Sequence, residues 1–224
     1  MDRDGAVLFD LDRTLCVKTQ DEDELLRKAF DRAGVEQYCS IADLVAVSDD
    51  LPTAESDVEF YELGLRAVAE ETAADPGDAP AVARAYDDLV DHSAVDFRPG
   101  ARAALEAVRE NYAVGLVTNG GRETQTTKLE ALGIADAFDA TVFADPANGV
   151  EPKPDSEPFR RALSALDVAP ENALHVGDSL SCDVAGANRF GLSSVWVPFE
   201  DETNDAGPTP TYILDSPGDL PALL

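Results

Sequence analysis

Several kinds of residue that define classes of protein are scarce in this sequence. Only three cysteines occur, Cys16, Cys39 and Cys182, and none forms a C-x-x-C pair. Their odd number and their spacing predict neither a disulfide framework nor a zinc site, and favour free thiols in a reducing compartment. No apolar run approaches the roughly 20 residues that a membrane span needs. Only one short apolar run, residues 6–9, precedes Asp10, which is unlike a secretory signal. We therefore expect a soluble, cytoplasmic protein without a membrane partner.

Basic residues are scarce as well. The chain has 17 Lys and Arg against 45 Asp and Glu, a formal net charge of −28, and only four of the basic residues are lysines. A nucleic-acid partner requires a basic surface that neutralises phosphates, so the charge argues against this class of partner. The acidic residues are spread along the chain, which is typical of adaptation to a high-salt cytoplasm, where a Debye length of about 3 Å at 1 M salt screens their repulsion. An acidic protein kept soluble by its charge is the alternative.

Length and composition allow one good hydrophobic core and a smaller appendage, because a chain of 224 residues buries roughly 70% of the surface that it exposes when unfolded. Short apolar runs that end in polar residues predict strands covered on both faces. Helical stretches lie between them, two of which are closed by Gly133 and Gly191. This alternation predicts right-handed crossovers and an α/β fold with a Rossmann-like parallel sheet. The predicted strands are 6–9, 113–117, 140–143, 173–176 and 193–197, and the predicted helices are 100–110, 122–132, 156–166 and 182–190.

The first predicted strand is separated from the others by a segment of a different kind. Between residues 16 and 97 the sequence indicates helices and shows no strand-type alternation of comparable quality. An independent N-terminal helical domain is the alternative, but it would leave the strand at 6–9 without a sheet. We expect a core domain of residues 1–15 plus 98–224, with residues 16–97 inserted as an α-helical cap domain. Residues 200–210 are linker-like in composition and predict a loop. The helices predicted in the cap are 23–33, 55–74 and 79–92.

Polar residues with catalytic potential occur in four places at or near the ends of the predicted strands. In an open parallel sheet, ligands bind beyond the carboxyl ends of the strands, so these residues are expected at one edge. The Gly120-Gly121 turn begins a helix whose exposed N–H groups favour an anion. The residues are Asp10 and Asp12 after the first strand, Thr118 and Asn119 after the second, Lys153 between two prolines, and Asp178 and Asp183 after a later strand.

Four carboxylates at one sheet edge require a compensating cation. Asp10, Asp12, Asp178 and Asp183 would repel one another, and their pKa values would rise without one. Oxygen ligands together with a phosphate suit Mg²⁺, which binds one or two carboxylates, keeps several waters and contacts substrate oxygens. The ion would also let an anionic substrate approach a chain of charge −28. Lys153 would share the charge of the phosphate and keep a nucleophilic carboxylate ionised.

Together and in this order, these segments resemble the four motifs of the haloacid dehalogenase-like (HAD) hydrolase superfamily. Each motif alone arises often by chance, but all four, each at a predicted strand end or adjoining loop, form a specific joint pattern that covers nearly the whole chain. The stretch from Thr118 to Trp196 is most similar to the capped phosphatase branch that contains pyrimidine 5'-nucleotidases and N-acylneuraminate-9-phosphatase. The motifs are residues Val7–Leu15, Leu116–Gly120, Lys153–Pro154 and Val176–Asp183.

The resemblance implies a phosphomonoester hydrolase that acts on a small phosphorylated metabolite through an aspartyl-phosphate. Asp10 is the implied nucleophile. Asp12 is the implied acid that protonates the leaving alcohol and then the base that takes a proton from water. Mg²⁺ is the implied cofactor, held by the side chains of Asp10 and Asp178 and by the backbone carbonyl of Asp12. Asp183 would support the metal or orient Lys153.

The same resemblance assigns the phosphate-binding residues. Thr118, the Asn119 N–H and the catalytic Lys153 would bind phosphate oxygens, so catalysis would rest mainly on positioning and charge stabilisation. Arg13 departs from the family pattern, in which a smaller residue such as Gly or Asn is common. It is interpreted either as a solvent-facing or cap-facing side chain or as a cation that contacts the substrate. His175 is interpreted as a packed core histidine.

Other functions stay open at this point. Asp12 argues against a 2-haloacid dehalogenase, because a halide leaves without a proton and the enzymes that break carbon–halogen bonds lack this second acid. A phosphate-binding or regulatory protein of the same fold without turnover is one alternative, and a sugar phosphomutase is another. No motif in the sequence identifies the substrate, the specificity residues of the cap, or the choice between monomer and homodimer.

Overall fold

The computed structural model describes residues 5–199 and 207–224, so the loop predicted at residues 200–210 lies largely outside the described residues. The chain divides into two compact units. Each unit buries apolar side chains of its own, so the two are described separately. The core unit comprises Met1–Val17 and Val95–Leu224, and the helical unit comprises Lys18–Ala94.

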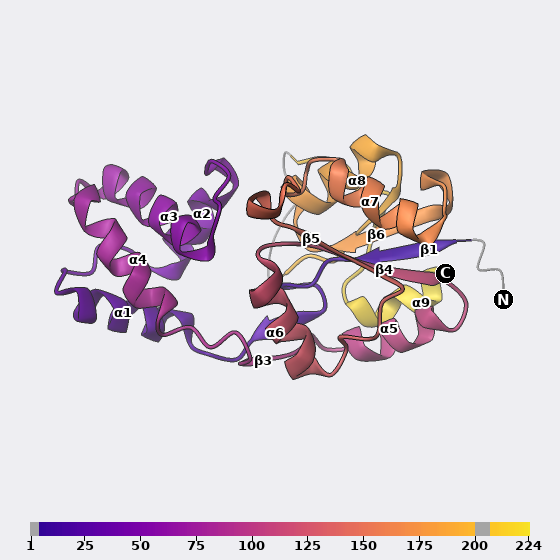
Figure 1. Ribbon diagram of the computed structural model, residues 1–224, viewed down its shortest axis with the longest axis horizontal. Coiled ribbons are helices and arrows are strands. Elements are labelled where there is room, and N and C mark those ends of the chain that lie inside the picture. The colour runs from indigo at the N-terminus through magenta and orange to yellow at the C-terminus, as the bar shows by residue number, and fades with distance from the viewer. Residues whose placement is uncertain (1–4, 200–206) are drawn as a thin grey trace. The chain divides into compact units, whose positions relative to one another are not determined.

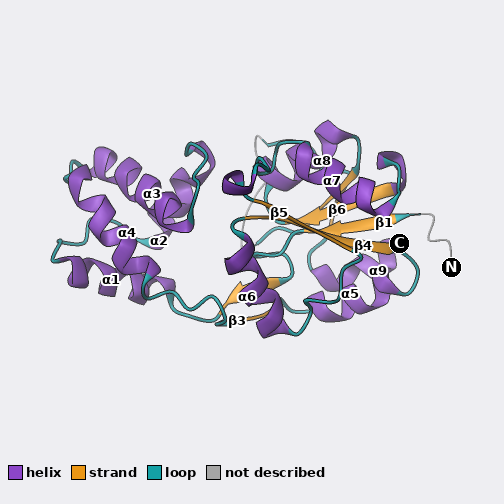
Figure 2. Cartoon of the chain, viewed as in Figure 1, coloured by secondary structure: helices purple, strands orange, loops and turns teal. Residues whose placement is uncertain are grey.

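The core unit is built on a six-stranded sheet in the order β5-β4-β1-β6-β7-β8, in which every neighbouring pair is parallel. β1 lies in the middle, so that Phe9 pairs with Leu116 of β4 on one side and Val176 of β6 on the other. The predicted parallel α/β fold is confirmed, and Figure 2 shows the strands between layers of helices. The strands are β1 (Ala6–Phe9), β4 (Ala113–Asn119), β5 (Ala140–Ala144), β6 (Ala173–Gly177), β7 (Ser193–Trp196) and β8 (Tyr212–Ile213).

Helices cover both faces of this sheet (Figure 1). Side chains alternate along a strand, so β1 directs Val7 and Phe9 to one face and Ala6 and Leu8 to the other. The first pair packs with α5, α6 and α9, and the second pair packs with α7 and α8. Phe9 is fully buried, which contributes about 1.5–3 kcal/mol to stability. The helices are α5 (Ala101–Arg109), α6 (Arg122–Leu132), α7 (Glu157–Leu166), α8 (Ala185–Phe190) and α9 (Leu220–Leu223).

The helical unit packs its helices around a separate apolar cluster. α1 begins after Asp21, whose carboxylate accepts a hydrogen bond from the Glu24 N–H. It ends at Gly34, which takes the left-handed conformation with φ 72° that a helix C-terminus favours. Leu26 and Phe30 on the inner face of α1 are almost fully buried in the cluster. The helices of this unit are α1 (Glu22–Ala33), α2 (Ile41–Val47), α3 (Asp57–Thr72) and α4 (Ala79–Asp87).

Several short elements differ from the sequence prediction. α2 was not predicted; it has only seven residues, and none of them is fully buried. β2 (Cys16–Lys18) and β3 (Val95–Phe97) form a small two-stranded sheet where only helices were expected. β8 and α9 are likewise too short to give a periodic pattern. The helix predicted from residue 182 is preceded by a π-helical turn, Leu180–Val184, which leads into α8.

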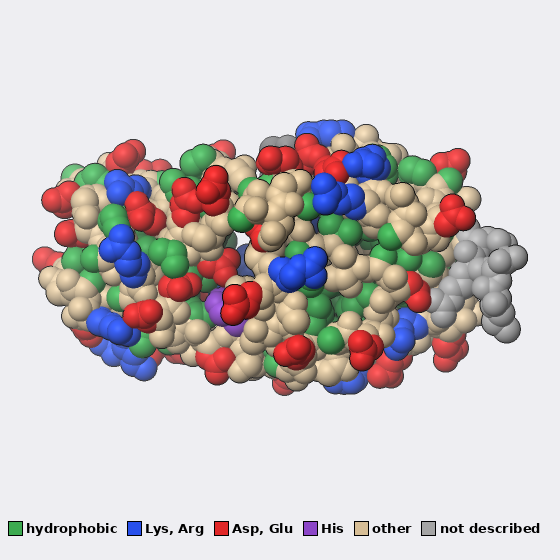
Figure 3. All heavy atoms as spheres, viewed as in Figure 1, with side chains coloured by type: hydrophobic (Ala, Val, Ile, Leu, Met, Phe, Trp, Pro, Cys, Tyr) green, Lys and Arg blue, Asp and Glu red, His purple; other side chains and the backbone are tan. Residues whose placement is uncertain are grey.

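The surface agrees with the composition. Figure 3 shows Asp and Glu side chains scattered over the visible face, with Lys and Arg side chains between them. Among residues 5–199 and 207–224, no helix combines the length and the apolar character needed to cross a bilayer.

Candidate active site

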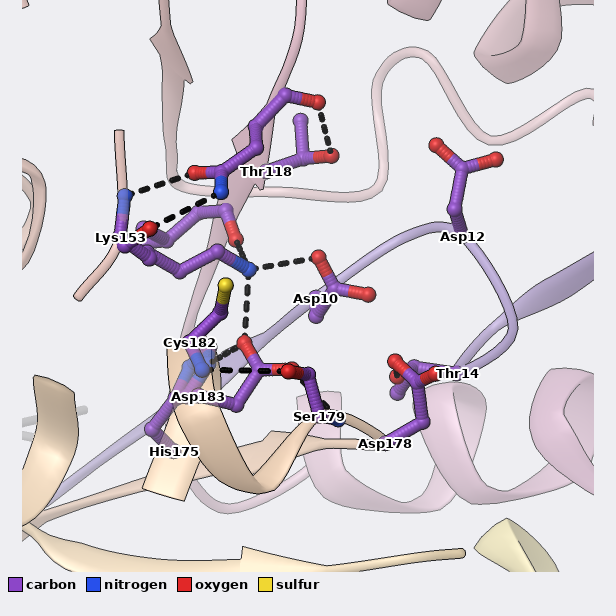
Figure 4. Close-up of polar contacts among 12 residues, drawn as sticks. Asp10, Asp12, Thr14, Thr118, Lys153, His175, Asp178, Ser179, Cys182 and Asp183 are labelled. Carbon is purple, nitrogen blue, oxygen red and sulfur yellow. Dashed lines mark hydrogen bonds and ion pairs between the residues drawn. The ribbon is translucent and has the colours of Figure 1, made fainter. Parts of the chain in front are cut away.

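Three strands of the core unit end at the residues that the motifs single out. β1 is followed by Asp10, β4 ends in Thr118 and Asn119, and β6 is followed by Asp178. The carboxyl ends of parallel strands meet at one edge of a sheet, and Figure 4 shows Asp10, Thr118 and Asp178 in the same region as Lys153. Asp10, Thr118, Lys153 and Asp178 are each at most 8% exposed. Their burial strengthens every electrostatic interaction among them.

The ammonium group of Lys153 joins two carboxylates. Its Nζ lies 2.6 Å from Asp10 Oδ1, 2.7 Å from Asp183 Oδ1 and 2.9 Å from the carbonyl oxygen of Val117. These three contacts use all three donors of an ammonium. The Asn119 amide holds the loop, because its Oδ1 accepts from the Lys153 N–H at 2.8 Å and its Nδ2 donates to the Lys153 carbonyl at 3.2 Å. A cis peptide bond links Lys153 to the next residue, a proline. The positive charge is thereby fixed against one oxygen of Asp10.

Asp183 holds the Lys153 ammonium in place. Its Oδ1 also contacts His175 Nε2 at 2.7 Å, and its Oδ2 accepts from the Ser179 N–H at 3.1 Å. Gly177 permits the close approach, because a Cβ at that position would lie 2.1 Å from Asp183 Cγ. Both oxygens of Asp183 are therefore engaged, and its main effect is to orient the Lys153 ammonium.

Burial and charge together set the protonation of the carboxylates. Burial raises the pKa of Asp10 from 3.8 to about 7, although the Lys153 ammonium acts in the opposite direction. Burial, followed by the charges of Asp10 and Asp183, raises the pKa of Asp178 well above its usual range. Burial would also raise the pKa of Asp183, but the Lys153 charge and the His175 hydrogen bond hold it below its usual range. Burial lowers the pKa of Lys153, but its two carboxylate neighbours outweigh burial and raise it overall. A further cation would stabilise the anionic forms of Asp10 and Asp178.

Three carboxylates form a cluster that fits a divalent cation. Asp10, Asp178 and Asp183 each offer an oxygen, and these oxygens lie within 4.8 Å of one another. Buried carboxylate oxygens are the ligands that Mg²⁺ prefers. Asp178 is held in place, because its Oδ1 accepts from the Thr14 hydroxyl at 3.3 Å and its carbonyl accepts from the Trp196 indole at 2.6 Å. Since both oxygens of Asp183 are already engaged, Asp10 and Asp178 are the side chains best placed to bind the ion.

The side chain of Asp12 does not join this cluster. It is 38% exposed, and Lys128 Nζ lies 2.8 Å from each of its two oxygens. Gln125 Nε2 donates to Asp12 Oδ2 at 2.9 Å and to Thr118 Oγ1 at the same distance. Figure 4 accordingly shows the Asp12 carboxylate apart from the group around Asp10. Of the three residues expected to bind the metal, two bring their side chains together, and the third was expected to contribute only its carbonyl.

Three buried residues of this site received no role from the sequence. Gln125 and Lys128 occupy the buried face of α6, at positions where the i, i+3, i+4, i+7 pattern of a core-facing helix calls for apolar residues. The occurrence of two polar residues at core-facing helix positions is the sequence signal by which Gln125 and Lys128 could have been identified. His175 packs edge-on against Phe159, as a core histidine does, but its contact with Asp183 gives it a polar partner that strand periodicity does not reveal.

Arg13 has a backbone conformation that small residues adopt more easily. Its φ of 59° lies in the left-handed region, where Gly and Asn are favoured. The guanidinium groups of Arg13 and Arg98 each lie 5.5 Å from the centre of the Phe199 ring. Arg98 also donates to the Arg13 carbonyl at 2.7 Å and to the Val197 carbonyl at 2.9 Å. The loop that carries Asp12 is thus tied to the end of β7.

Comparison with known proteins agrees with the motif pattern. The family model for haloacid dehalogenase-like hydrolases matches residues 5–191. A glyceraldehyde 3-phosphate phosphatase of Methanopyrus kandleri is 31% identical over 96% of this chain and 94% of its own length. The pyrimidine 5'-nucleotidase YjjG of Escherichia coli is 34% identical over 56% of each chain, and N-acylneuraminate-9-phosphatases also match, which confirms the predicted resemblance to this branch. The chain spans 42% to 56% of the length of several other curated relatives that it matches.

Solved structures share the fold. The HAD-hydrolase YfnB of Bacillus subtilis, in a structure with bound magnesium, superposes with a TM-score of 0.77 at 22% identity and covers 99% of both chains. A likeness at this identity shows the fold alone, whereas the family model covers most of the chain. The parallel sheet, the four motifs at its edge and the family match lead to one conclusion: the chain belongs to the haloacid dehalogenase-like hydrolase family.

Proposed function

We propose that this chain is a Mg²⁺-dependent phosphatase that hydrolyses a small phosphorylated metabolite through an aspartyl-phosphate on Asp10. The asymmetric environment of the Asp10 carboxylate carries the proposal. Lys153 holds Oδ1 at 2.6 Å, while no residue in the described part of the chain hydrogen-bonds to Oδ2. A carboxylate that is fixed through one oxygen and open at the other is suited to attack phosphorus in line.

The phosphate would lie against the end of β4. The Thr118 hydroxyl accepts a hydrogen bond from Gln125 and makes only a 3.4 Å contact to the Asn119 carbonyl, so its hydrogen is available to a phosphate oxygen. The Asn119 N–H is the second proposed donor. Lys153 lies against the nucleophile itself and supplies positive charge where negative charge develops.

The carboxylate cluster supports the choice of Mg²⁺. Asp10 and Asp178 would hold the ion through their side chains and Asp12 through its carbonyl, with Asp183 in support. The bound ion would offset the carboxylate charges and stabilise the charge on the transferring phosphoryl group. The raised pKa values of Asp10 and Asp178 support this assignment, because both anions are disfavoured without a cation.

Asp12 is the proposed acid and base. Its carboxylate is partly exposed and stands apart from the proposed metal ligands, so it is able to exchange protons with a leaving group or a water. It would give a proton to the departing alcohol and take one from the water that hydrolyses the aspartyl-phosphate. A dehalogenase needs no such residue, which favours phosphate esters over carbon–halogen substrates.

Phosphate release from p-nitrophenyl phosphate in molar KCl tests this function. We expect turnover with Mg²⁺, its loss with a chelator, and its loss in the Asp10→Asn protein. A pure, folded protein that binds phosphate but turns over no ester would instead support a regulatory role. Conversion of sugar 1-phosphates without net phosphate release would support a phosphomutase.

The substrate is proposed only as a class. Relatives act, by name, on glyceraldehyde 3-phosphate, phosphoserine, pyrimidine 5'-nucleotides and N-acylneuraminate 9-phosphate, so a screen of phosphomonoesters at high salt should begin with these. The proposed cap role of residues 16–97 is tested by substitutions there that change the ranking of these esters. We further propose that the protein is cytoplasmic and is a monomer or a homodimer. Light scattering distinguishes the monomer from the homodimer.

A further inference from the structure

The buried face of α6 contains two polar side chains that a core helix does not need. Gln125 is 2% exposed and Lys128 is 5% exposed, and they share this face with Leu129 and Leu132. Burying a lysine ammonium is unfavourable unless an acceptor of opposite charge balances it. A local break with the apolar pattern of this kind is typical of a functional position.

Both side chains contact the same carboxylate. Lys128 Nζ lies 2.8 Å from Asp12 Oδ1 and 2.8 Å from Oδ2, and Gln125 Nε2 lies 2.9 Å from Oδ2. The same Gln125 nitrogen lies 2.9 Å from Thr118 Oγ1 and 2.6 Å from the Asn119 carbonyl. Asp12 is thereby tied to the two residues proposed to bind phosphate. We call Gln125 and Lys128 the α6 clamp.

We propose that the α6 clamp is a pair of positioning residues that holds the Asp12 carboxylate in one orientation beside the phosphate site, where it takes a proton from water. This inference rests on the proposed phosphatase function. Lys128 contacts both oxygens of the carboxylate and Gln125 contacts one of them, and these contacts fix the orientation of the group. The clamp therefore places Asp12 where it exchanges a proton with a group bound at the phosphate site.

The two chemical steps use Asp12 differently. In the first, a bond forms between Asp10 and phosphorus, the bond from phosphorus to the ester oxygen breaks, and an alcohol leaving group takes a proton from Asp12. In the second, water attacks phosphorus and gives a proton to Asp12, and the bond from phosphorus to Asp10 breaks. The second step always needs Asp12, whereas the first step needs it only when the leaving group must be protonated, so the effect of losing the clamp is seen alone in the second step when the leaving group needs no proton.

A substrate with a good leaving group isolates that step. Dinitrophenolate departs from 2,4-dinitrophenyl phosphate without a proton, so the first step with this substrate needs no acid. In Lys128→Met, which keeps the length of the side chain but removes its charge, we expect phosphorylation of Asp10 at close to the wild-type rate. Hydrolysis of the phosphoenzyme should fall about 10–100-fold, less than the 10²–10⁴-fold effect of a general base, because Asp12 remains.

The expected signature is a burst of about one dinitrophenolate per enzyme, followed by slow turnover. Equal losses in the burst and in the steady-state rate would indicate a merely structural role for Lys128 and would overturn the proposal. Leu132→Met is the matched control, since it changes buried packing on the same helix away from Asp12, and we expect it to retain wild-type kinetics.

A double-mutant cycle shows whether the clamp acts through Asp12. In the Asp12→Asn background, Lys128→Met and Gln125→Met should cause no further loss of phosphoenzyme hydrolysis. Independent, multiplicative losses would overturn the proposal.

Different results would refute the clamp and the proposed phosphatase function. A folded wild-type protein that hydrolyses no ester would refute the phosphatase function. The clamp would then be judged from a crystal structure of the Gln125→Met/Lys128→Met protein, in which we expect the Asp12 carboxylate to leave its place beside Thr118. An unchanged Asp12 in that structure would overturn the clamp.

Discussion

Replacing Lys153 with Met tests the electrostatic design of the site. Its Nζ contacts Asp10 and Asp183 at 2.6 and 2.7 Å, and the side chain is only 2% exposed. Met has a similar length and an apolar stem, so the substitution removes the charge with little change in volume. It leaves two carboxylates buried without their cation, and breaking a buried ion pair from one side costs about 3–5 kcal/mol of stability. We expect turnover to fall at least about 100-fold, because the charge that faces the developing anion is lost.

Tryptophan fluorescence measures the loss of stability in the core unit, which contains Lys153. Trp196 is the only tryptophan, it is buried in the core unit, and its indole donates to the Asp178 carbonyl. Urea unfolding of the Lys153→Met protein in molar KCl should therefore show a lower midpoint by this probe. The control is Arg160→Met, which removes an exposed ion pair with Glu157 on α7 and should leave the midpoint unchanged.

The Lys153→Met and Arg160→Met proteins should therefore differ in both stability and turnover. An unchanged unfolding midpoint in Lys153→Met would show that the ammonium does not balance the buried carboxylates. Retained turnover would show that it does not assist phosphoryl transfer. Either result would refute the proposed electrostatic role of Lys153.

Three further predictions concern the carboxylates. Asp10→Asn should abolish turnover while the circular dichroism spectrum and the melting profile stay native, and residual turnover at the wild-type rate would exclude Asp10 as nucleophile. Gly177→Ala should reduce turnover and stability together, because the new Cβ would lie 2.1 Å from Asp183 Cγ and displace the anchor of the site; wild-type kinetics in this variant would contradict the packing. In metal-free protein, the pKa of Asp10 is about 7 when folded, against an ordinary value of 3.8, so the folded state binds this proton more tightly. This shift lowers the free energy of unfolding of the metal-free protein. The loss is absent below pH 4 and grows to on the order of 4 kcal/mol as pH rises through 7. Urea unfolding should show that the wild-type protein loses stability relative to the Asp10→Asn protein as pH rises, and Mg²⁺ should reduce this loss. A stability difference between the two proteins that does not change with pH would contradict the raised pKa of Asp10.

The sequence predicted those parts of the fold that periodicity controls. The strand at 6–9 has the predicted bounds because it is a wholly apolar run that ends in an acidic residue. The helix over 122–132 has the predicted bounds because it follows the Gly120-Gly121 turn and is closed by Gly133. β8 and α2 were missed, since two strand residues or seven partly exposed helix residues carry little pattern. The strands of the β2–β3 sheet have three residues each and depend on pairing between distant segments, which a local pattern does not show.

The candidate site was predictable where function dictates residue type at a strand end. Asp10, Thr118 and Asp178 follow from the rule that ligands bind at the carboxyl edge of the sheet. The partners of Asp12 were not predicted, because Gln125 and Lys128 lie on a helix face whose neighbours are set by tertiary packing. The full engagement of Asp183 was also not predicted, since it depends on Gly177 and on the turn of π-helix that follows β6.

Trapping the phosphoenzyme tests the central claim most directly. Wild-type enzyme mixed with a turned-over ester and Mg²⁺, quenched in acid within one turnover and digested, should yield a hydroxylamine-sensitive phosphate on the peptide that contains Asp10. Its formation should be at least as fast as steady-state turnover, and the Asp10→Asn protein should carry none. Turnover without any phosphorylated peptide, or phosphate on a different residue, would contradict the claim that Asp10 attacks phosphorus.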